Sequence, residues 1–273
     1  DTDILKIMNE NLVPYMGEIN HGSDYSMVKE MTMEDGFMQD QVELVKKILA
    51  GCGRDAFILG TLHGITASAI HPLENMDPNY TYDQVREKLC RLLHEDEDTV
   101  LAGMKRIADV MCELAGTYIE LGVDGVYYAA LGGETRFFTD EEFDKWIKPF
   151  DLQIMKAIKD AGGYCFLHIC KDQLNMDRYK DYGPYADVVN WGVYEAPFSL
   201  EDGRKMFAGK TIMGGLPNRH GVLVDGPAEA VKEETRKGIE DFGRTHFILG
   251  ADCTLATEQD MDLLKAAVEA ARE

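Results

Sequence analysis

The sequence predicts an α/β fold, a (β/α)₈ barrel built as a single domain over residues 1–273. Short runs rich in β-branched and aromatic residues alternate with long amphipathic helical patterns, as in repeated βα units around a parallel sheet. Polar side chains also gather where the predicted strands end, which is the face that carries the active site in such barrels. The length of 273 residues is typical of this fold.

The strand predictions rest on short apolar runs that are rich in β-branched or aromatic residues. They cover 56–62, 125–129, 164–170, 187–191, 211–214 and 245–250, with a weaker strand at 3–7. Seven strands fit an eight-stranded barrel that is entered after its first strand. Because the chain begins with Asp1 and runs directly into the segment 3–7, we expect the first strand to be absent from this chain.

Helical periodicity separates these strands. The predicted helices cover 38–50, 82–94, 99–121, 140–161, 226–242 and 258–272. Thr139 and Thr257 precede acidic residues and are predicted as N-caps, while Gly122 follows a helix as a C-terminal signal. No linker or fixed repeat interrupts the pattern, which favours one domain. A doubly wound sheet has the same alternation, but the sequence has no G-x-G-x-x-G after a strand.

Composition excludes some classes of partner. The 49 acidic and 28 basic residues give a net charge of -21, which repels nucleic acid and anionic membranes. The six cysteines lack the spacing of a disulfide scaffold, and we find neither a membrane-spanning apolar run nor a signal-peptide pattern. We therefore expect a cytoplasmic protein.

The segment 166–170, Phe-Leu-His-Ile-Cys, is the most specific motif. Side chains two apart in a strand share a face, so His168 and Cys170 reach the same point. Cys253 follows the last predicted strand, and closure of a barrel brings it to the same rim. One nitrogen and two sulfurs suit zinc, and three protein ligands leave a fourth position for substrate. Taken alone, a His-x-Cys pair is also compatible with ordinary core or rim residues.

Three segments carry a family resemblance: 164–170 (Tyr-Cys-Phe-Leu-His-Ile-Cys), 213–216 (Met-Gly-Gly-Leu) and 247–253 (Phe-Ile-Leu-Gly-Ala-Asp-Cys). Together they resemble the uroporphyrinogen decarboxylase superfamily over essentially the whole chain. Within it, the chain is more similar to the zinc-dependent cobamide methyltransferases. The resemblance implies that His168, Cys170 and Cys253 bind a catalytic zinc. It also implies methyl transfer between a corrinoid protein and a small acceptor, either a thiol such as coenzyme M or tetrahydrofolate.

The chain departs from the family pattern in several places. The methyltransferases usually have Gly after His-Ile-Cys, where this chain has Lys171, and their second Cys lies between glycines rather than between Asp252 and Thr254. The decarboxylases resemble the chain in fold but carry a late strand-end His where this chain has the segment 251–253, Ala-Asp-Cys. A decarboxylase-like lyase of porphyrin biosynthesis is the alternative function, and a barrel retained as a non-catalytic subunit is a second one.

Three further residues follow predicted strands. Glu134 follows a Gly-Gly turn and could be a fourth metal ligand, or a solvated loop acid. His63 and His220 could bind substrate in the pocket, or be structural histidines of the rim.

Four other residues are predicted to bind substrate. The guanidinium of Arg219 could hold a carboxylate or sulfonate, or form a salt bridge to acidic loops. Tyr128 and Tyr127 point to opposite faces of one strand, and position favours Tyr128 as the pocket residue. Asn190 and Trp191 end the predicted strand 187–191 and are assigned to the pocket by position.

Overall fold

The computed structural model describes residues 19–52, 56–74, 79 and 81–273. The chain packs as two compact units, of which the first ends at Cys165 and the second runs from Phe166 to Glu273. The predicted strand at 3–7 lies outside the described residues. None of the described helices is long and apolar enough to cross a membrane.

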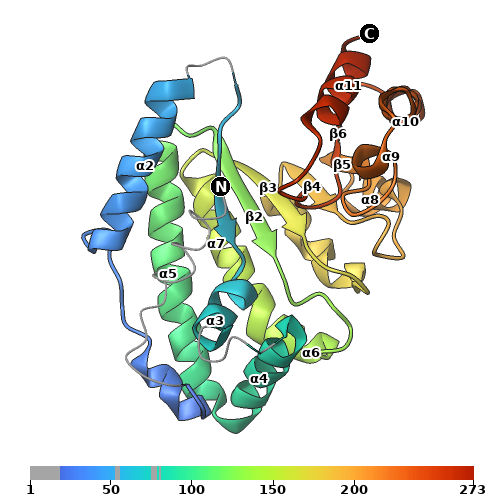
Figure 1. The fold of residues 1–273 in the computed structure, drawn as a ribbon. Helices are drawn as coiled ribbons and strands as arrows, with labels where there is room; N and C mark the ends of the chain where they lie inside the picture. Colours follow the sequence, from blue (N-terminus) through green and yellow to red (C-terminus); the bar gives the residue numbers. More distant parts are fainter. Residues whose placement is uncertain (1–18, 53–55, 75–78, 80) are drawn as a thin grey trace. The chain divides into compact units, whose positions relative to one another are not determined.

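The first unit pairs two parallel strands and covers them with helices (Figure 1). Its elements are η1 (Gly22–Met27), α2 (Gly36–Cys52), β1 (Leu59–His63), α3 (Ile65–Glu74), α4 (Tyr82–Glu95), α5 (Glu97–Leu121), β2 (Gly125–Ala130), α6 (Asp140–Glu142), η2 (Phe143–Ile147) and α7 (Lys148–Asp160), followed by the start of β3 (Tyr164–Ile169). The register of β1 and β2 runs from Leu59 opposite Gly125 to His63 opposite Ala129.

The long helix α5 forms the centre of the first unit. It begins after Asp96, whose side chain accepts a hydrogen bond from the Thr99 amide at 3.2 Å, and it ends at Gly122, which has a left-handed φ of 102°. Its buried side chains recur at helical spacing and include Val100, Met104, Ile107, Met111 and Leu114. A Cβ at Gly60 in β1 would lie 2.4 Å from the Tyr118 ring, so the strand passes close to α5.

The second unit continues β3 and adds three parallel strands with their helices (Figure 1). Its remaining elements are η3 (Met176–Tyr185), β4 (Val188–Trp191), α8 (Leu200–Met206), β5 (Thr211–Leu216), α9 (Val222–Asp225), α10 (Ala228–Phe242), β6 (Phe247–Ala251) and α11 (Met261–Arg272). Strands consecutive in the chain pair with one another throughout this unit. Parallel strands alternating with helices confirm the predicted α/β class.

The core of the second unit lies between β5 and its helices. Leu216 packs in one cluster with Leu223, Val231 and Leu263, which come from α9, α10 and α11. Burial of such side chains stabilises the fold by about 1.5–3 kcal/mol each.

The structure also corrects some boundaries. The last helix begins at Met261 rather than at 258, and its N-cap is Asp260, which accepts from the Asp262 amide at 2.8 Å. The cap predicted at Thr257 is therefore wrong, whereas Thr139 caps α6 as predicted. A π-helical turn, η2, interrupts the helix predicted at 140–161. The six strands predicted between 56 and 250 are confirmed as β1 to β6.

Candidate metal centre

His168, Cys170 and Cys253 come together in the second unit. His168 lies on β3, Cys170 follows the end of β3, and Cys253 lies two residues beyond β6. The two Sγ atoms are 3.8 Å apart, and Nε2 of His168 is 3.4 Å from Sγ of Cys253. The three donor atoms all lie within 4.8 Å of one another. The side chains of His168 and Cys170 therefore come together, as the alternation of side chains along a strand predicts.

These separations fit a single tetrahedral metal ion. Two sulfurs that each bind zinc at about 2.3 Å would be about 3.8 Å apart, and a sulfur and an imidazole nitrogen about 3.6 Å apart. The observed 3.8 Å and 3.4 Å are close to both values. A disulfide would instead require about 2.05 Å between the sulfurs. The donor set and its spacing are therefore those of a group that can hold a metal ion.

The ring of His168 is held from its other side by Asn190. His168 is 3% exposed, and its Nδ1 lies 2.5 Å from Oδ1 of Asn190 on the neighbouring strand β4. The two residues are opposite each other in the register of β3 and β4. Asn190 was predicted as a substrate-binding residue, and the structure places its side chain against a residue of the metal-binding group.

The electrostatics of the cluster favour a thiolate. The hydrogen bond with Cys170 lowers the pKa of Cys253 most, burial opposes that effect, and a further hydrogen bond with His168 lowers the pKa again. Next to it, Asp252 is 1% exposed and accepts from the amides of Tyr194 at 3.2 Å and Gly215 at 3.3 Å. Burial raises the pKa of Asp252 to about 6. Its carboxylate thus links β5 and the segment that follows β4 to the residue before Cys253.

Lys171 occupies a backbone conformation that favours glycine. It follows Cys170 directly and has a φ of 89°, in the left-handed region. The methyltransferases that the chain resembles usually have Gly at this position. Lys171 therefore adopts the left-handed turn that Gly would adopt without strain, and its backbone is strained as a result.

We expect Lys171→Gly to raise the free energy of unfolding by about 0.5–1 kcal/mol. Relief of the left-handed strain stabilises the folded state by more than the greater conformational entropy of the unfolded chain costs. Urea denaturation of the two proteins measures this difference. Lys205→Gly is the control: Lys205 lies in α8, so its replacement should lower the stability instead. A Lys171→Gly protein less stable than the parent would contradict the strain.

The remaining predicted residues of the second unit divide between rim and core. Nε of Arg219 forms an ion pair with Oε1 of Glu195 at 2.6 Å, which is the alternative considered for it, and His220 is exposed. Trp191 is fully buried, and its Nε1 donates to the carbonyl of Phe198 at 2.9 Å. Alternation along β4 sends Trp191 to the face opposite Asn190, so the structure does not bring it to the cluster.

The structure also places Asn218, a polar residue after a predicted strand, in this region. It is 7% exposed, and its Nδ2 donates to the carbonyl of Thr254 at 2.9 Å. This bond joins the segment after β5 to the residue that follows Cys253. A buried amide after a strand was the available signal, but its partner is 36 residues away.

Three predicted residues lie in the first unit. Both carboxylate oxygens of Glu134 have partners there: Oε1 is 2.8 Å from Nη1 of Arg86, and Oε2 accepts from the Gly132 amide at 3.1 Å. Tyr128 is fully buried, and its hydroxyl donates to the buried Asp151 of α7. The ring of His63 lies 5.4 Å from that of the buried His71 on α3.

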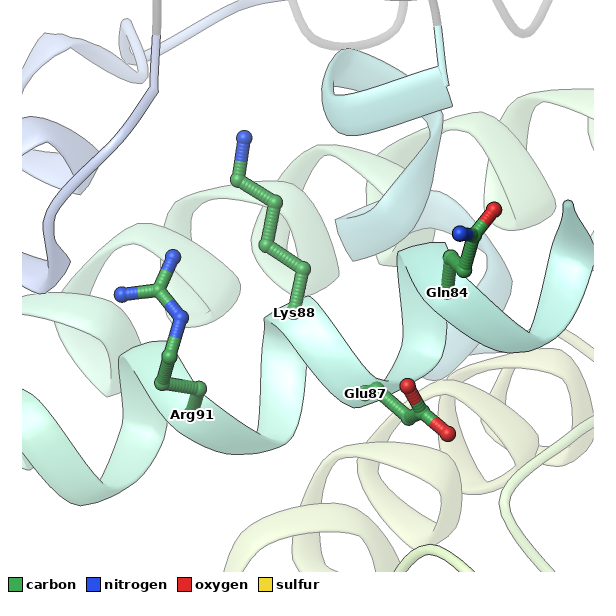
Figure 2. Close-up of a pocket in the computed structure, with 4 residues that line it drawn as sticks. All are labelled: Gln84, Glu87, Lys88 and Arg91. Carbon is green, nitrogen blue, oxygen red and sulfur yellow. The ribbon is translucent and has the colours of Figure 1, made fainter. Parts of the chain in front are cut away.

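A hollow on α4 is a different kind of feature. It has a volume of about 320 Å³ and is lined by Gln84, Glu87, Lys88 and Arg91 (Figure 2). All four come from one helix at spacings of three and four residues, and Arg91 donates to Glu95 at 3.2 Å. We assign no function to this hollow, because Gln84, Glu87 and Arg91 are exposed and Lys88 is the one buried residue of its lining.

The chain combines an α/β fold with a His-x-Cys pair at the end of β3 and a further Cys after β6. A family model described as "Uroporphyrinogen decarboxylase (URO-D)" matches residues 80–273, which is more than half of the chain. The chain belongs to the uroporphyrinogen decarboxylase family. This confirms both the family predicted from the motifs and the predicted fold class.

Solved structures have a similar fold. A methyltransferase from Methanosarcina mazei matches with a TM-score of 0.69 and 17% identity, over 88% of this chain and 65% of that one. A B12-independent methionine synthase from Shewanella sp. W3-18-1, solved in complex with selenomethionine, matches with a TM-score of 0.53 and 16% identity, over 85% of this chain and 66% of that one. A putative B12-independent methionine synthase from Listeria monocytogenes has a TM-score of 0.54 at 14% identity, over 91% of this chain and 73% of that one. The chain thus spans about two thirds of the first two proteins, and at these identities the similarity concerns the fold.

Among curated proteins, Albumin-2 of Lathyrus sativus is 31% identical over 86 residues, which is 29% of this chain and 38% of that protein. Albumin-2 of Pisum sativum is 30% identical over 86 residues, or 29% of this chain and 37% of that protein. Because these matches cover less than a third of the chain, they do not assign it to a family.

Proposed function

We propose that this protein is a zinc-dependent methyltransferase that moves a methyl group between a corrinoid protein and a small acceptor, a thiol such as coenzyme M or tetrahydrofolate. The observation that carries the proposal is the arrangement of His168, Cys170 and Cys253 with tetrahedral spacing. Their number leaves one coordination position for a substrate, which is typical of catalytic zinc. The spacing of the six cysteines is not that of a disulfide scaffold, which supports the reducing cytoplasm as the compartment.

The chemistry follows from the donor set. Zinc held by these side chains would lower the pKa of a substrate thiol, so that a nucleophile forms near neutral pH. For a thiol acceptor, the substrate sulfur would release its proton to solvent and bond to the methyl carbon. The corrinoid carried by the partner would supply that methyl group and keep both electrons of the bond it gives up. His168, which is buried, and Cys253 contribute by fixing where the acceptor sulfur must bind.

A decarboxylase-like lyase is the alternative within the same family. That reaction would give no role to two thiols held 3.8 Å apart beside an imidazole. The methyltransferase and the methionine synthases of similar fold support methyl transfer in general but not the corrinoid donor, because both synthases are B12-independent. The donor set therefore favours methyl transfer.

A methyl-transfer assay tests the proposal. Protein loaded with one equivalent of zinc is incubated with free methylcobalamin and either coenzyme M, a panel of other thiols, or tetrahydrofolate. We expect one acceptor to be methylated with loss of the methylcobalamin spectrum, and the rate to fall to the uncatalysed level after chelation of the zinc. Decarboxylation of a porphyrinogen by metal-free protein, with no methylated product, would overturn the proposal.

A further inference from the structure

The Asn190 side chain is buried and makes hydrogen bonds that substrate binding would not require. It is 1% exposed and lies in register between His168 on β3 and Met213 on β5. Its Nδ2 donates to the carbonyl of Met213 at 2.9 Å and to the carbonyl of Ala251 at 3.3 Å. Its side chain therefore connects all four strands of the second unit.

The two carbonyls fix the direction in which the amide points. A carbonyl oxygen can only accept hydrogen bonds, so the atom of Asn190 that faces Met213 and Ala251 must be the NH₂ group. The atom that faces His168 is then Oδ1, which is also only an acceptor. A contact of 2.5 Å between Oδ1 and Nδ1 of His168 therefore requires the proton to be on Nδ1.

That proton position decides what the other ring nitrogen can do. In a neutral imidazole with Nδ1 protonated, Nε2 has a free electron pair. Nε2 is the atom that lies 3.4 Å from Sγ of Cys253. The amide thus presents the correct nitrogen of His168 to the point where the two sulfurs meet.

We infer that Asn190 is a positioning residue, which holds His168 as its Nδ1-protonated tautomer and so keeps Nε2 ready to bind the metal. This rests on the proposed zinc site. It reassigns Asn190 from substrate binding to the support of a metal ligand. Residues that orient a metal-binding histidine in this way change metal affinity by about 10–100-fold when they are lost.

Three variants separate tautomer control from mere packing. Asn190→Ala removes the acceptor and both donors. Asn190→Asp keeps an acceptor for Nδ1 of His168 but loses the two donors to Met213 and Ala251. Trp191→Phe is the matched control, because it removes a buried hydrogen bond from the same strand to a backbone carbonyl, that of Phe198, on the face opposite Asn190.

Two measurements are made on each protein. Competition with a chromophoric chelator gives the zinc dissociation constant, and long-range ¹H–¹⁵N correlation spectra of metal-free, ¹⁵N-histidine-labelled protein at pH 8 show whether Nδ1 of His168 is protonated. We expect zinc binding to weaken about 10–100-fold in Asn190→Ala, with loss of the Nδ1 proton signal. Asn190→Asp should keep the Nδ1 proton, and Trp191→Phe should keep both the proton and the affinity.

Two results would overturn the inference. One is an unprotonated Nδ1 in the parent protein. The other is an Asn190→Asp protein that folds but loses the Nδ1 proton, because the amide donors would then be the cause. The spectra are recorded without metal, so they still report on Asn190 if the protein transfers no methyl group or binds no zinc. Failure of the inference and failure of the proposed function therefore give different results.

Discussion

Replacing Cys253 by Ser is expected to remove zinc from the protein and to abolish methyl transfer. A serine hydroxyl is not ionised at neutral pH and is a poor zinc ligand, so two protein ligands would remain. We expect zinc affinity to fall by more than about 100-fold, since even loss of a ligand's hydrogen-bonded partner costs about 10–100-fold. Metal analysis after dialysis measures the first effect, and the methylcobalamin assay measures the second.

Cys52→Ser is the control for this variant. Cys52 is an exposed thiol in α2, outside the cluster, so its replacement should leave zinc content and activity unchanged. A Cys253→Ser protein that is folded and retains one zinc per chain would contradict the assignment of Cys253 as a ligand.

Replacing Glu134 by Gln is expected to lower the free energy of unfolding by about 3–5 kcal/mol, while the zinc content stays the same. The Arg86 side chain is 2% exposed and that of Glu134 is 0% exposed, and their ion pair is 2.8 Å long. Removing the carboxylate takes the nearer counter-charge from a buried guanidinium, because the Asp83 carboxylate is 3.8 Å away and half exposed. Urea denaturation monitored by circular dichroism gives the stability, and metal analysis gives the zinc content.

Glu95→Gln provides the comparison for Glu134. Glu95 pairs with Arg91 at 3.2 Å, but both side chains are substantially exposed, so we expect little change in stability. If Glu134→Gln instead lost zinc at unchanged stability, the carboxylate would be the fourth metal ligand that the sequence suggested. The partners of its two oxygens favour the structural role.

The strands and the longer helices were predictable because local patterns define them. Alternating βα segments gave β1 to β6, and the cap at Thr139 and the stop at Gly122 were visible in the sequence. Helix α3 (Ile65–Glu74) was missed because Thr66, Ser68 and His71 are interspersed with its apolar residues and Pro72 follows them, which hides a helical period. The C-terminal helix was extended too far because Thr257 and Asp260 are both acceptable caps, and only the structure distinguishes them.

The three donor residues of the candidate site were predictable from the sequence, but the residues that position them were not. The two-residue spacing of His168 and Cys170 on one strand determines a common face, and Cys253 follows the last strand. The role of Asn190 depends on the carbonyls of two other strands, and that of Asp252 on two distant amides. Such partners arise from sheet register, which no local pattern specifies.

X-ray absorption at the zinc edge tests the central claim most directly. Protein purified without added zinc should contain about one ion per chain, bound by two sulfurs at about 2.3 Å and by nitrogen or oxygen at about 2.0–2.1 Å. If the methyl-transfer assay identifies a thiol acceptor, its addition should raise the number of sulfurs from two to three, because the fourth position is open to substrate. No zinc, or a coordination shell without the two protein sulfurs, would contradict the account.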